Sequence, residues 1–152
     1  MDAQKFISDV SPAAISSEAK TAIPASFVIA EAALESGWGD CAPGFNLFGV
    51  KADSSWTGNV TVQRTREFLH GHWVLIEAKF RAYSGWLESI EDHAKFLTTN
   101  ARYKAAFAFR DGASFAQAVA KAGYATDPTY AAKIISIIRE HGLALFDVKA
   151  SH

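Results

Sequence analysis

Residues 24–39 read PASFVIAEAALESGWG and decide the fold. Pro24 suits the first turn of a helix, and the glycines at positions 37 and 39 are typical of a helix end. Apolar side chains recur between them at helical spacing: Phe27, Ala30, Leu34 and Trp38. Apart from Glu31 and Glu35 the segment is nearly all small or apolar, so we expect a buried helix at the centre of the molecule. A carboxylate on such a helix needs an explanation, because an unpaired buried charge is costly.

The segments on either side of this helix predict a second helix and a loop. Ser11 before Pro12 has the pattern of an N-cap followed by a first-turn proline, so we expect a helix from there toward Thr21, with a separate short helix before it. Residues 41–57 are rich in Gly, Asn, Asp, Ser and Pro, yet they carry several large apolar side chains. This composition predicts an irregular, ordered loop that lines a groove.

A β-hairpin is predicted next. Residues 60–68 and 73–83 carry β-branched and aromatic residues in partial alternation, with Gly71 between them. The alternation puts Val74, Ile76, Ala78 and Phe80 on one face and Trp73, Leu75, Glu77 and Lys79 on the other. We expect one of these faces to meet the body of the protein.

The chain after Ser84 reads as helical to Gly142, with Ser114 as the N-cap of one helix and Asp127-Pro128 opening the last. Several helices interrupted once by a hairpin indicate an α+β fold, in which a mainly helical lobe and a small antiparallel β-hairpin lobe form a cleft. We expect one domain over residues 1–152, because this length suits a single core.

Composition excludes several classes of partner. Fifteen Lys and Arg residues against sixteen Asp and Glu give a formal charge of −1, so we expect no nucleic-acid partner. Apolar runs are too short to cross a bilayer, and the first residues lack the pattern of a secretory signal. We therefore expect no membrane insertion, and delivery by cell lysis, a holin or another export route. Cys41 is the one cysteine, which rules out an intramolecular disulfide.

Glu35 has the setting that a general acid requires. Glycoside cleavage needs a proton for the leaving oxygen, and a carboxyl half-buried among apolar groups holds that proton because desolvation raises its pKa. Glu35 ends an apolar helix, where its side chain can face a groove with Trp38 beside it. On periodicity alone, a surface glutamate at an exposed helix end is the simpler interpretation.

The string Ala32-Ala33-Leu34-Glu35-Ser36-Gly37-Trp38-Gly39 closely resembles the catalytic motif of the bacterial peptidoglycan glucosaminidases of glycoside hydrolase family 73, which includes flagellar rod-associated hydrolases. The resemblance continues, in order, through residues 46–52, 65–68, 78–83 and 123–130. It covers about residues 20–142, and collinear pieces are more specific than any one of them.

The resemblance implies a lysozyme-like helical lobe facing a small β-lobe, with Glu35 as general acid. It also implies that Glu67, on the first hairpin strand, is the second acidic residue, which activates water as a general base or stabilises positive charge at the anomeric carbon. Tyr124 matches a tyrosine of the family's active site, where a phenol could orient water or hold the substrate's acetamido group.

Further residues near these motifs are candidates for binding substrate. Aromatic side chains that could stack on sugar rings are Trp38, Phe48, Trp56, Tyr83 and Tyr130, about half of which we expect to be core residues instead. Asn46 and Lys51 could reach hydroxyl or carboxylate groups of the glycan.

Glu31 stands where the family often has glutamine, one helical turn before Glu35. Two carboxylates at this spacing repel each other, and burial can raise the pKa of one of them, so we predict that Glu31 tunes Glu35. His70 and His72 lie near Glu67 and Glu77, but histidines at a hairpin turn are usually solvated. We expect no metal site and no cofactor.

The sequence therefore predicts an endo-β-N-acetylglucosaminidase that cleaves the β-1,4 bond after N-acetylglucosamine in the glycan strands of peptidoglycan. We expect a monomer that acts at the bacterial cell wall, either as a phage or prophage product or as a domain of a larger enzyme. A lytic transglycosylase on the same substrate and a non-catalytic glycan-binding or assembly module are the alternatives. Inverting and retaining mechanisms are both open.

Overall fold

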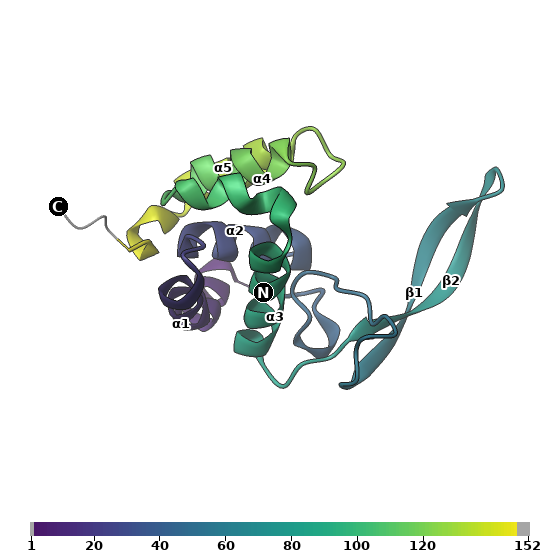
Figure 1. Ribbon diagram of the computed structural model, residues 1–152. Helices are drawn as coiled ribbons and strands as arrows, with labels where there is room; N and C mark the ends of the chain where they lie inside the picture. The colour runs from purple at the N-terminus through teal and green to yellow at the C-terminus, as the bar shows by residue number, and fades with distance from the viewer. Residues whose placement is uncertain (1, 149–152) are drawn as a thin grey trace.

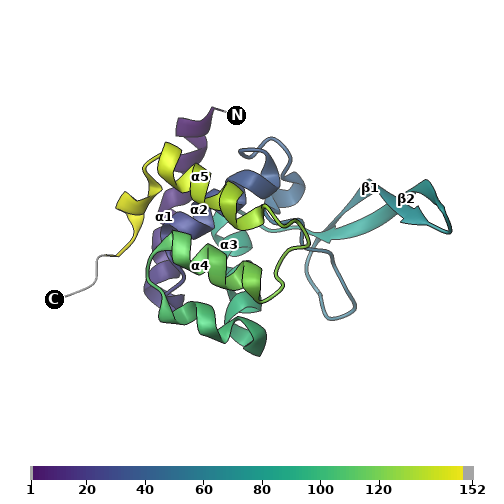
Figure 2. The same ribbon diagram turned by 90° about the horizontal axis from the view of Figure 1, so that it is seen from above.

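A computed structural model describes residues 2–148 as a helical lobe from which one β-hairpin projects (Figures 1 and 2). The elements in chain order are α1 (Ala3–Thr21), α2 (Ala25–Ser36), the 3₁₀ turn η1 (Pro43–Phe45), β1 (Val60–Leu69), β2 (His72–Arg81), α3 (Trp86–Thr99), the 3₁₀ segment η2 (Ala101–Ala108), α4 (Gly112–Lys121), α5 (Tyr130–Glu140) and η3 (Leu143–Phe146). The predicted α+β class, with a helical lobe and a two-stranded antiparallel lobe, is confirmed.

Helix α2 is the centre of the helical lobe, as predicted. Every residue from Ala25 to Ala33 is buried, and the helix contacts α1, α4, α5 and η3. It ends where Gly37 takes a left-handed φ of 58°. Glycine adopts that conformation without the steric cost of a side chain, so the sequence correctly predicts this helix end.

The first turn of α2 is completed by carboxylates from distant parts of the chain. Pro24 precedes the helix and supplies no side-chain cap. Instead, Glu18 Oε1 accepts from the amide of Ala25 at 2.9 Å, and Asp147 Oδ1 accepts from the amide of Ser26 at 2.7 Å. Anionic groups are favourable at this end of a helix because its free N–H groups carry partial positive charge.

The prediction of two helices before residue 21 is wrong. Helix α1 is continuous from Ala3, with Pro12 inside it, and Asp2 accepts from the amide of Gln4 as the N-cap in place of Ser11. An internal proline loses one backbone hydrogen bond. The buried face of α1 nevertheless runs past it, through Phe6, Val10, Ala13, Ala14 and Ser17. Packing against α2 and α3 offsets the local cost.

The hairpin forms with the predicted turn, and its attachment to the body is narrower than expected. His70 and Gly71 both have positive φ, as a tight two-residue hairpin turn requires. On β2 the side chains of Val74, Ile76 and Ala78 are half-buried, Phe80 is buried, and Trp73 and Leu75 are 61% and 67% exposed. Among the hairpin residues, all of which the structure describes, only Phe80 reaches full burial, at the base. The face therefore meets the body only there.

The remaining boundaries differ by a few residues from those predicted. Asp111 caps α4 by accepting from the amide of Ser114, so the helix begins at Gly112 and not after Ser114. Residues 41–57 form the expected irregular loop, which pairs with the hairpin through a bridge between Lys51 and Phe80. This loop brings its side chains to the base of β2.

Candidate active site

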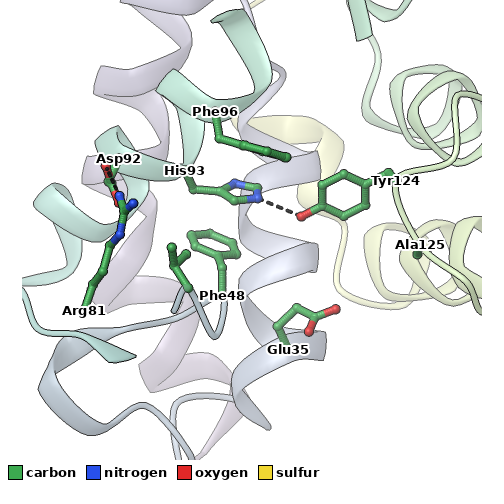
Figure 3. A pocket seen from close by; sticks show the side chains of 9 residues that line it. Glu35, Phe48, Arg81, Asp92, His93, Phe96, Tyr124 and Ala125 are labelled. Atoms are coloured by element: carbon green, nitrogen blue, oxygen red, sulfur yellow. Dashed lines mark hydrogen bonds and ion pairs between the residues drawn. The ribbon is translucent and has the colours of Figure 1, made fainter. Parts of the chain in front are cut away.

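A pocket of about 380 Å³ lies where α2, the 41–57 loop, the base of β2, α3 and the segment after α4 meet (Figure 3). Its lining residues come from all of these elements: Glu35, Phe48, Val50, Arg81, Asp92, His93, Phe96, Tyr124 and Ala125. Two of the three predicted catalytic residues, Glu35 and Tyr124, are therefore brought together with Phe48 from the predicted binding set.

Glu35 points into the pocket from the last turn of α2 (Figure 3). The residue as a whole is exposed, yet the pKa of its carboxyl is raised above the ordinary value. Partial loss of water is the largest cause, and the negative charge of Glu31 adds to it, while His93 acts in the opposite direction. A carboxyl with this pKa shift keeps its proton to higher pH, which suits a general acid.

A buried hydrogen-bonded group lies behind Glu35. Glu31, one turn earlier on α2, is fully buried and accepts a hydrogen bond from the Tyr124 hydroxyl. His93 Nε2 lies 2.7 Å from the same hydroxyl and 3.3 Å from Glu31 Oε1. Burial and the charge of Glu31 both raise the pKa of Tyr124, so its phenol stays neutral.

The opposite side of the pocket is closed by an ion pair at the base of the hairpin. Arg81 Nη1 lies 2.9 Å from Asp92 Oδ2 on α3, and Tyr83 donates to the same oxygen at 2.6 Å. Burial and this contact raise the pKa of Tyr83. The three side chains join the end of β2 to α3.

Glu67 lies away from the pocket wall. It stands on β1 opposite Val74, near the far end of the hairpin, and its Oε1 is 3.3 Å from Lys51 Nζ. The structure thus places the two predicted carboxylates on different lobes, one in the pocket and one on the arm. Lys51 contacts Glu67 rather than the pocket.

Most of the other predicted binding residues serve the fold. Trp38 packs edge-on against Phe6 and His141 and is not among the residues that line the pocket. Asn46 is buried, and its side-chain amide is used in hydrogen bonds to the backbone. It donates to the carbonyls of Val50 and Arg81 and accepts from the amide of Val50.

Trp56 packs against Tyr83 and lies under the guanidinium of Arg81, at 4.8 Å from the ring centre. Tyr130 is buried against Tyr124, and its hydroxyl finds no hydrogen-bond partner within residues 2–148. Four of the five aromatic candidates, Trp38, Trp56, Tyr83 and Tyr130, thus make packing contacts, whereas about half were expected to be core residues.

His93, Arg81, Asp92 and Phe96 are pocket residues that sequence reasoning did not assign. Arg81 falls inside the matched stretch 78–83, so the resemblance contained a signal for it. His93 lies next to the apolar stripe of α3, a position that on its own favours a core histidine.

Neither a metal site nor a membrane span is found in the part of the chain that the structure describes. Within residues 2–148 no group of three or more His, Cys, Asp or Glu side chains could hold a metal ion. Over the same residues, no helix combines the length and the hydropathy needed to span a bilayer.

Comparisons with known proteins agree with this arrangement. A family model described as mannosyl-glycoprotein endo-beta-N-acetylglucosaminidase matches residues 11–143. "Peptidoglycan hydrolase FlgJ" of Salmonella typhimurium is 42% identical over 147 residues, covering 91% of this chain and 46% of that protein. The chain spans about half the length of the FlgJ proteins that it matches.

Solved structures show the same fold. The glycoside hydrolase domain of Salmonella typhimurium FlgJ superimposes with a TM-score of 0.83 at 39% identity, covering 93% of this chain and 98% of that one. The catalytic domain of the autolysin Auto from Listeria monocytogenes gives a TM-score of 0.83 at 33% identity, covering 95% and 87%. On the family match and these similarities, the chain belongs to the glucosaminidase family of glycoside hydrolase domains.

Proposed function

We propose that this protein hydrolyses the glycan strands of peptidoglycan at the bacterial cell wall, cutting the β-1,4 bond after N-acetylglucosamine. The observation that carries the proposal is Glu35, a carboxyl with a raised pKa that faces an open pocket at the junction of the two lobes. Membership of the family supports this substrate class, as does the similarity to FlgJ proteins, which are peptidoglycan hydrolases.

Glu35 acts as the general acid. Its proton passes to the glycosidic oxygen as the bond from that oxygen to the anomeric carbon breaks, and the leaving sugar departs with a new hydroxyl. Positive charge develops at the anomeric carbon, and water adds to that carbon while giving up one proton to a carboxylate, either Glu67 or the Glu35 that has just lost its proton. The surroundings of Glu35 favour its protonated form, because partial loss of water and the charge of Glu31 raise its pKa.

Two groups can take part in the substitution at the anomeric carbon. Glu67 acts as base if the hairpin brings it over the bound glycan, which gives inversion. Alternatively the substrate's own acetamido group attacks the anomeric carbon first, held by the phenol of Tyr124, which gives retention. Anomeric analysis of the first product separates the two routes: the α-anomer supports Glu67, and the β-anomer supports the acetamido group.

The test is digestion of purified sacculi followed by mass spectrometry of the released fragments. We expect wild-type protein to release fragments with reducing N-acetylglucosamine ends, and Glu35→Gln to release almost none. Glu140→Gln is the matched control, because Glu140 is exposed at the end of α5. Anhydro sugar ends would instead support a lytic transglycosylase, and binding without release would support a glycan-binding module. Full activity of Glu35→Gln would remove the acid assignment.

A further inference from the structure

His93 is a buried pocket residue with no role in the mechanism above. Its side chain is 7% exposed, and the ring of Phe48 stacks on it with ring centres 4.0 Å apart and planes 13° apart. The stacking fixes the imidazole so that Nε2 points at the Tyr124 hydroxyl, 2.7 Å away (Figure 3).

The hydrogen-bond count at Tyr124 fixes the direction of this contact. A phenol has one proton to donate and lone pairs to accept with. That proton goes to Glu31 Oε1, which is fully buried and would otherwise be short of donors. The contact between His93 and Tyr124 must then run the other way, with an Nε2–H donating to the phenol oxygen.

We propose that His93 is a positioning residue for the hydrolysis. Its Nε2–H holds the Tyr124 phenol against Glu31 and so leaves the remaining lone pair of the phenol oxygen for water or substrate in the pocket. The inference rests on the proposed function, since it assigns a task to Tyr124 within that site. Both the neutral Nε2–H form and the imidazolium donate, so the hydrogen bond does not depend on the charge of His93.

A pair of amide substitutions tests the position of the donor. Glutamine can place a side-chain N–H close to that of Nε2, whereas asparagine, one methylene shorter, cannot reach the phenol. We expect His93→Gln to keep kcat within about threefold of wild type, and His93→Asn to lose about 10- to 100-fold in kcat with little change in KM, the scale expected when a reacting group is misplaced by about 1 Å. Equal activity of the two variants, at either level, would overturn the proposal.

A double-mutant comparison then asks whether His93 acts through Tyr124. His93→Phe preserves the ring that stacks on Phe48 and removes the donor. We expect its loss of kcat to disappear when it is made in a Tyr124→Phe protein, because the group that it positions is already absent. Independent, multiplying losses would contradict the proposal. If His93→Phe does not fold, as judged by its melting curve, the glutamine and asparagine pair still decides.

These outcomes differ from failure of the proposed function. If the protein does not hydrolyse peptidoglycan, the wild type itself shows no turnover. If only the role of His93 is wrong, the wild type turns over and the glutamine and asparagine variants have equal activity.

Discussion

Replacing Glu31 by glutamine removes one buried charge close to the acid and keeps an oxygen that can accept from Tyr124. Glu31 and Glu35 are one helical turn apart on α2, so their Cβ atoms are about 5–6 Å apart. Two unit charges at about 6 Å repel by about 1.5–3 kcal/mol at an effective dielectric constant of about 20–40. Because Glu35 is exposed, solvent screens its repulsion by Glu31, so we take the lower end of this range, which corresponds to about a tenfold change in an equilibrium constant.

The direction of the expected change follows from the proposed role of Glu35 as general acid. A general acid works only while it is protonated, so kcat/KM falls as pH rises through its pKa. Glu31 raises that pKa, and its loss lowers it. We therefore expect the alkaline limb of the pH profile of Glu31→Gln to move to lower pH. On that limb the activity of Glu31→Gln should be about tenfold below that of the wild type. At pH values below the alkaline limbs of both proteins, the two activities should be equal.

The assay is the rate of sacculus solubilisation by wild type, Glu31→Gln and the control Glu140→Gln across a pH series at constant ionic strength. Melting curves at each pH show that the variants stay folded. An alkaline limb that stays in place, or that moves to higher pH, would refute the electrostatic reasoning. Either result would indicate that the charge of Glu31 does not raise the pKa of Glu35.

Three further predictions concern stability. Gly44→Ala should reduce the free energy of unfolding by about 1–3 kcal/mol in urea titrations, because Gly44 has φ +64° and an added Cβ would lie 2.8 Å from that of Ala82. Asp92→Asn weakens the ion pair with Arg81, so hydrogen exchange should accelerate at the hairpin amides while those of α2 keep their rates. Burial raises the pKa of Glu18 in the folded protein, so the free energy of unfolding should fall as pH rises above about 4.5, and that part of the fall should be absent in Glu18→Gln.

The parts of the fold that were predictable are those fixed by neighbours in sequence. The apolar spacing of residues 24–36 and the glycine at position 37 predicted α2 and its end, and Gly71 predicted the turn of the hairpin. The helix start predicted at Ser11 and Pro12 is wrong. Their local preference for a helix start is outweighed by the packing of the buried face of α1, which continues past both residues. The prediction of Ser114 as an N-cap is wrong because Asp111 caps the same turn by accepting from the amide of Ser114.

The site was only partly predictable because its contacts join residues far apart in the chain. Glu35 and Tyr124 were found through the family motif, and both line the pocket. His93 contacts Glu31 and Tyr124 across 62 and 31 positions of sequence, and no local pattern reports such a contact. The position of Glu67 was equally inaccessible, because it depends on how the hairpin leaves the body.

The two predicted carboxylates are held in very different ways, and this bears on how they act. Glu35 belongs to a helix that is buried along most of its length and held at its first turn by Glu18 and Asp147, so the acid has a fixed place relative to Tyr124. Glu67 belongs to a two-stranded arm whose residues are mostly exposed and which joins the body at its base. Such an arm has few tertiary contacts to hold it in one position. We therefore expect any part that Glu67 plays in hydrolysis to involve movement of the arm over a bound glycan, whereas the proposed proton donation by Glu35 would need no rearrangement of the core.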